Sequence, residues 1–159
     1  MQLRKSNNRG GFTLIEILIV IAILGLLASI VLVGLGGARA KARDARRIAD
    51  LRGVQNALEV YYSARGQYPP PGAWEAFLTG AAPGAPDLGI KKIPKDPINN
   101  PAGGYIYQYG TNGPDYTHYT LWAKLEQDNP ALKDDIDNPN PFGIGFDCSD
   151  DNFYYCVGL

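Results

Sequence analysis

The sequence predicts an α+β fold in which a long N-terminal α-helix packs against a small antiparallel sheet of about three strands, in a lollipop-like arrangement. Residues 12–35 are almost wholly apolar, and an apolar face at spacings of three and four continues to about residue 62. Beyond the prolines at 69–71, short tyrosine-rich segments alternate as strands do. A chain of 159 residues has room for one modest domain and one such extended element.

The first half of the helix shows no polar face, so we expect it in lipid or among similar helices. Its charge-free part, Ile17–Ala38, is long enough to cross a hydrocarbon core of about 30 Å. A secretory signal would explain the basic start, but the run is too long and no A-x-A cleavage site ends it. A plain membrane anchor leaves Glu16 unexplained, because an unpaired carboxylate there costs on the order of 1–3 kcal/mol. Glu16 therefore needs a partner.

A short basic leader precedes the string Gly11-Phe12-Thr13-Leu14-Ile15-Glu16. This string resembles the cleavage and methylation signature of type IV pilins and type II secretion pseudopilins, and the resemblance covers roughly residues 1–60. It implies that an inner-membrane prepilin peptidase removes leader 1–11 by cutting between Gly11 and Phe12, and that the new amine of Phe12 is methylated. It also makes Glu16 the acid used in assembly.

Physical reasoning supplies a partner for that acid. Cleavage creates a cation at Phe12, and Glu16 lies one helical turn away on the same face. In a bundle of such helices, Glu16 of one subunit can neutralise the Phe12 amine of a neighbour, which favours one register of assembly.

Membrane orientation is predicted differently by charge and by resemblance. Three bases precede the apolar run and six follow it within residues 38–52, so the positive-inside rule alone places the N-terminus outside. The resemblance implies a cytoplasmic leader, a single-pass precursor in the inner or cytoplasmic membrane with its head exported, and then an extracellular or periplasmic filament. Glycines in the run permit either close helix packing or local unwinding on assembly (Gly25, Gly34, Gly36 and Gly37).

The basic stretch at 38–52 has three possible roles: a solvated face near anionic headgroups, pairing with acids of adjacent subunits, or DNA capture. Without residues 1–11 the chain carries 12 bases and 16 acids, a formal charge of -4, so we expect no nucleic-acid partner.

Changes in composition along the chain predict four segments. They are the leader 1–11, the transmembrane and assembly half of the helix 12–38, the amphipathic half of the helix 39–66, and the globular head 67–159. The amphipathic half presents one apolar face and ends at Gly66 and the prolines (Ile48, Leu51, Val54, Leu58 and Tyr61 or Tyr62). In the head we expect a short helix at 73–78 and strands at 105–109, 116–125 and 153–157. Alternate residues 119–125 should face the core, with His118 solvated on the opposite face.

Tyrosine-rich segments after a proline-containing loop also resemble major pseudopilins of type II secretion (Asp96-Pro97, Tyr105-Ile106-Tyr107 and Tyr119-Thr120-Leu121). This second resemblance covers about 30 residues.

The last twelve residues contain both cysteines, Cys148 and Cys156. In an exported protein they suit a local disulfide worth roughly 2–3 kcal/mol, and in a cytosolic one they would be free thiols. Six aspartates lie in the loop-like sequence between residues 134 and 151 (Asp134, Asp135, Asp137, Asp147, Asp150 and Asp151). They form either a solvated tail or a calcium site, since hard cations take several loop carboxylates. Major pseudopilins, which the sequence resembles, bind calcium in their C-terminal loops, but the spacing of these aspartates matches no calcium-binding pattern. Asp147, Asp150 and Asp151 are the candidate ligands, and no other cofactor is expected.

Catalysis finds little support, because the chain has one histidine, no phosphate-binding glycine loop and no serine elbow. We therefore expect a structural subunit of a type IV pilus or pseudopilus filament, and the major pseudopilin of a type II secretion system is the alternative. A membrane-tethered module whose residues 67–159 recognise a ligand is the alternative of a different class. The expected partners are identical subunits, prepilin peptidase, an inner-membrane assembly platform, and the membrane before assembly.

Overall fold

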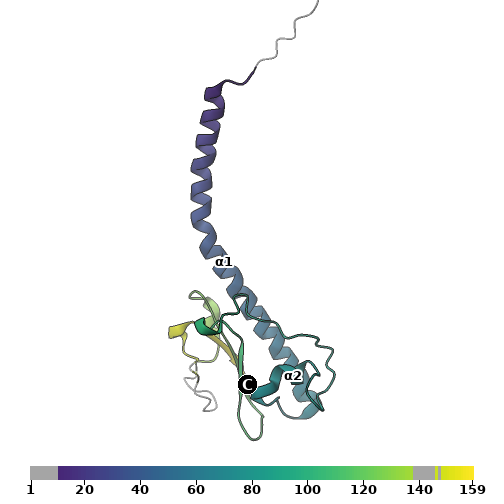
Figure 1. The fold of residues 1–159 in the computed structure, drawn as a ribbon. Coiled ribbons are helices and arrows are strands. Elements are labelled where there is room, and N and C mark those ends of the chain that lie inside the picture. Colours follow the sequence, from purple (N-terminus) through teal and green to yellow (C-terminus); the bar gives the residue numbers. More distant parts are fainter. Residues whose placement is uncertain (1–10, 138–145, 147) are drawn as a thin grey trace, which may run out of the picture. The chain divides into compact units, whose positions relative to one another are not determined.

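The computed structural model describes residues 11–137, 146 and 148–159, and within residues 31–35 it describes the backbone only. The chain divides into two compact units, Met1–Arg39 and Ala40–Leu159 (Figure 1). The predicted leader, 1–11, lies outside the described residues except for its last glycine.

Helix α1, Leu14–Arg65, begins in the first unit. The large apolar side chains between Phe12 and Ile30 are at least half exposed in the isolated subunit. In the part of the chain whose side chains are described, no helix has an apolar stretch long enough to cross a membrane. The predicted span, Ile17–Ala38, includes residues 31–35, whose side chains lie outside that part.

The second unit forms around the C-terminal half of α1. The predicted apolar face is confirmed: Leu51, Val54 and Leu58 are buried in one core with residues of the sheet. The helix ends where the sequence predicts, because Gly66 adopts a positive φ of 70° and donates its N–H to the Tyr62 carbonyl.

The predicted antiparallel sheet is present, with strands β1 (Gln108–Thr111), β2 (Tyr119–Lys124) and β3 (Tyr154–Gly158) in the order β1-β2-β3. Both pairings are antiparallel. Short helical turns flank the sheet: η1 (Pro71–Ala73) contacts β1, while η3 (Pro130–Asp134) and η5 (Asp150–Asn152) contact β3. The predicted short helix is α2, Trp74–Leu78, and η2 spans Pro101–Gly103. The predicted α+β fold is confirmed.

Two predicted strand boundaries are wrong. Residues 105–107 are not in β1, because η2 and a single bridge between Asn100 and Tyr105 form a closed turn there. Strand β2 begins at Tyr119 rather than Tyr116, whose φ of 48° belongs to the preceding turn. His118 therefore lies in this turn, where its N–H donates to the Asn112 side chain, and not on a strand face.

Strand β2 is buried on both of its faces, whereas alternation predicted one. Tyr119, Leu121 and Ala123 face the main core as expected. On the other face Trp122 stacks on Phe146, 4.1 Å between ring centroids, and belongs to a second small cluster with the two cysteines. The C-terminal segment supplies this cover.

Candidate functional site

The first candidate functional feature is the start of α1. Thr13 donates both its N–H and its hydroxyl to Glu16 Oε2, at 2.8 and 2.9 Å. In return the Glu16 N–H donates to the Thr13 hydroxyl at 3.3 Å. This reciprocal capping box satisfies amide groups that a helix start leaves unpaired.

Gly11 and Phe12 precede this cap in non-helical backbone. Phe12 is 85% exposed, and apart from Gly11 and its chain neighbours no described residue has a heavy atom within 4 Å of a Cβ placed at Gly11. The peptide bond between them is thus open to an approaching protein, while Glu16 is held one turn into the helix.

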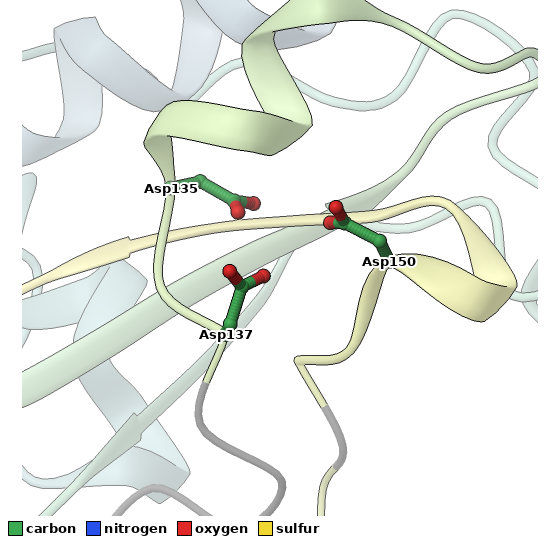
Figure 2. Close-up of side chains that lie close together, drawn as sticks. All are labelled: Asp135, Asp137 and Asp150. Atoms are coloured by element: carbon green, nitrogen blue, oxygen red, sulfur yellow. The ribbon is translucent and has the colours of Figure 1, made fainter.

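The second feature is a cluster of three aspartates in the C-terminal region. One oxygen from each of Asp135, Asp137 and Asp150 lies within 4.8 Å of the others, and the three carboxylates point toward one another (Figure 2). Asp135 and Asp137 follow η3, whereas Asp150 opens η5. Two segments from different parts of the tail therefore converge here.

The electrostatics of this cluster favour binding of a cation. Burial, followed by the charges of Asp150 and Asp137, raises the pKa of Asp135 to about 6 despite its hydrogen bond from the Cys156 N–H at 2.7 Å. Burial and neighbouring carboxylates also raise the pKa of Asp150. The Oδ1 atoms of Asp135 and Asp150 are buried, and neither has a hydrogen-bond partner among the residues that the structure describes. Carboxylate oxygens in this arrangement are the ligands that calcium prefers.

Only one of the three predicted calcium candidates lies in this cluster. Asp150 does, Asp151 is exposed outside it, and Asp147 lies outside the described residues. Sequence reasoning did not select Asp135 and Asp137, because 13 residues separate Asp137 from Asp150 in the chain. The signal that connects them is the cysteine pair.

The predicted disulfide joins Cys148 and Cys156, whose Cα atoms are 5.9 Å apart. Both cysteines are fully buried. The bond closes the loop that contains Asp150, and Cys156 is also the residue whose N–H binds Asp135. The disulfide thus ties the two halves of the aspartate cluster together.

Sequence reasoning missed an ion network around Arg47. This fully buried guanidinium contacts Asp96 at 2.6 Å, and Asp44 and Glu126 at 2.7 Å. Arg43 joins the network through a bidentate pair with Glu126. The hydrogen bonds from Arg43, and to a lesser extent from Arg47, lower the pKa of Glu126 to about 2, although burial acts in the opposite direction. Arg46 also pairs with Asp50, at 3.5 Å, so three bases of the 38–52 stretch bind acids of their own chain, a role not among the three predicted.

Comparison with known proteins identifies the family. Residues 6–32 match the prokaryotic N-terminal methylation motif. Type II secretion system core protein G of Vibrio cholerae is 34% identical over 146 residues, covering 87% of this chain and 97% of the relative. The chain belongs to the type II secretion system core protein G family.

Other members of the core protein G family show similar sequence identity to this chain. The Escherichia coli protein is 33% identical over 144 residues, covering 86% of this chain and 94% of its own. The Aeromonas hydrophila protein is 37% identical over 104 residues, covering 61% of this chain and 73% of its own. No solved structure gives a significant match. The predicted function, a structural subunit of a pilus or pseudopilus filament, is confirmed at this level.

Proposed function

We propose that this chain is a pseudopilin of a type II secretion system, cut between Gly11 and Phe12 by prepilin peptidase and methylated at Phe12. It waits as a membrane-anchored precursor and then polymerises with identical subunits on an inner-membrane assembly platform. The resulting filament is periplasmic. Its role is mechanical and involves no catalysis. The names of the relatives support the secretion system, and the methylation motif at 6–32 supports the processing.

The exposed capping box is the observation that carries this proposal. It holds the Glu16 carboxylate at the helix start, four residues from the Phe12 nitrogen that cleavage converts to a cation. Because the apolar side chains from Phe12 to Ile30 are exposed in the isolated subunit, they need lipid before assembly and neighbouring helices after it.

Mass spectrometry of the mature protein tests the processing. We expect the first peptide to begin with N-methylphenylalanine at Phe12, and the precursor to persist in cells without prepilin peptidase. A mature chain that begins at an intact Met1 supports the membrane-tethered binding module instead.

We further propose that the Asp135–Asp137–Asp150 cluster binds calcium. Its support is the convergence of three carboxylates in one place and the two buried Oδ1 atoms, which have no hydrogen-bond partner among the described residues. A divalent cation would relieve the repulsion among these groups and stabilise the tail against the sheet.

The test is thermal unfolding of the full chain in detergent, with and without calcium. We expect calcium to raise the melting temperature of wild type and not of Asp150→Asn. Asp134→Asn is the matched control, because Asp134 is an exposed acid beside the cluster. The same calcium response in wild type and Asp150→Asn contradicts the site.

A further inference from the structure

A groove of about 660 Å³ lies on the second unit between the η1–α2 segment and the loop at 91–95. Its polar rim is mostly basic, because Lys91, Lys92 and Lys95 line it with Glu75 as the one acid. All three lysines are exposed. A neighbouring hollow shares Lys92 and Lys95 and extends the positive surface to Arg46. We call these three lysines and their groove the lysine groove.

Within the described residues, none of these lysines has a carboxylate within ion-pairing distance. By contrast, Arg43 and Arg47 on the same unit have acids in direct contact. The fold therefore neutralises Arg43 and Arg47 internally and leaves the lysine groove for an external acid.

Two exposed acids lie beside the opposite edge of the sheet. Asp128 and Asp151 are exposed, and their charges, with that of Asp137, act on the Asp150 carboxyl. Neither Asp128 nor Asp151 belongs to the aspartate cluster, so both stay available if that cluster holds a cation. We call Asp128 and Asp151 the acidic edge.

The groove and the acidic edge lie beside opposite edges of the sheet. The groove is lined by η1, which contacts β1, whereas η5 contains Asp151 and contacts β3. The sheet order β1-β2-β3 separates them by its full width, and Figure 1 shows α2 and the yellow helical turn that precedes β3 on different sides of the unit. One molecule cannot join its own groove to its own acidic edge across the sheet.

We propose that the lysine groove of one subunit receives the acidic edge of a second copy of this chain. The contact is heterologous, because two different surfaces meet, and repetition of such a contact produces an open helical array and not a closed dimer. The inference rests on the proposed filament function and adds a charge contact between the second units of neighbouring subunits that fixes the neighbour's position. Complementary charge favours the correct neighbour and penalises a contact of like charges.

Zero-length carbodiimide cross-linking of filaments assembled from full-length chain tests this directly. Filaments built from a mixture of ¹⁴N- and ¹⁵N-labelled subunits distinguish links between copies from links within one. We expect mixed-isotope peptides that join a lysine of the groove to Asp128 or Asp151. Filaments whose mixed-isotope links never involve the lysine groove overturn the proposal.

Charge reversal supplies the second test. Lys92→Glu and Asp151→Lys should each lower filament yield about fivefold or more, since one exposed pair is worth up to about 1 kcal/mol and reversal adds repulsion. The double variant should recover most of the yield. Lys133→Glu and Asp115→Lys are matched controls, being exposed charges outside both surfaces, and should assemble as wild type does.

A double variant that assembles no better than the single variants, with all variants folded by their melting temperatures, also overturns the proposal. The proposal is also overturned if the lysine groove binds anionic vesicles and charge reversal leaves the filament yield unchanged. If wild-type chain forms no filament at all, the proposed function itself fails, which is a separate and distinguishable result.

Discussion

Thr13 and Glu16 cap each other at the start of α1, with the Glu16 carboxylate accepting both polar hydrogens of Thr13. The same carboxylate is the group proposed to neutralise the Phe12 amine of a neighbouring subunit. Its two roles can be separated experimentally, because a glutamine completes a capping box but has no charge.

Glu16→Gln should therefore leave the precursor and its cleavage intact while filament yield falls at least about tenfold, the change expected for roughly 1.4 kcal/mol. Thr13→Ala removes the cap and keeps the charge, so it should cost about 1 kcal/mol of local helix stability and reduce yield less. Precursor processing and sheared filaments are measured by immunoblot. Normal filaments from Glu16→Gln would show that no ion pair is needed.

The buried Arg47 network predicts a large stability effect in the second unit. Arg47→Met leaves the acids of Asp44 and Asp96 buried without their cation, which should cost about 3–5 kcal/mol. Urea unfolding followed by the fluorescence of the buried Trp74 and Trp122 measures it.

Arg46→Met is the control for that experiment. Arg46 is 61% exposed and makes a 3.5 Å pair with Asp50, so its loss should change the free energy of unfolding by less than about 0.5 kcal/mol. Equal effects of the two variants would mean that the buried network contributes nothing specific.

The two unusual carboxyls predict a stability maximum in mild acid. Without calcium, the raised pKa of Asp135, about 6, means that protonation favours the folded state, so stability rises as pH falls from about 7 toward 4. The lowered pKa of Glu126, about 2, contributes stability above about pH 4.5 that is lost as pH falls toward 2. Melting temperature against pH in a chelator measures both limbs.

Asp135→Asn should flatten the limb between pH 7 and 4, removing on the order of 1–2 kcal/mol once solvent screening is included, and leave the acid limb unchanged. Calcium should also flatten it, because a bound cation lowers the pKa of its ligand. A wild-type curve that falls steadily from pH 7 downward would contradict the raised pKa of Asp135.

Periodicity predicted the helix and the sheet because burial sets those patterns locally. Leu51, Val54 and Leu58 recur at helical spacing since one face of α1 meets the sheet. Two features escaped prediction because they depend on distant contacts. The burial of Arg47 requires Asp96 and Glu126, which lie 49 and 79 residues away. Likewise the aspartate cluster joins Asp135 and Asp137 to Asp150, which lies in a different segment of the chain.

The loop closed by the disulfide leads to a final prediction. Replacing Cys148 and Cys156 by alanine should cost roughly 2–3 kcal/mol of stability, the chain-entropy value for so short a loop. It should also weaken the response to calcium, because the disulfide fixes Asp150 beside the Cys156 N–H that holds Asp135. Thermal unfolding with and without calcium measures both effects. A double-alanine variant that loses stability but keeps the full calcium shift would show that β3 pairing alone positions Asp150, independently of the disulfide.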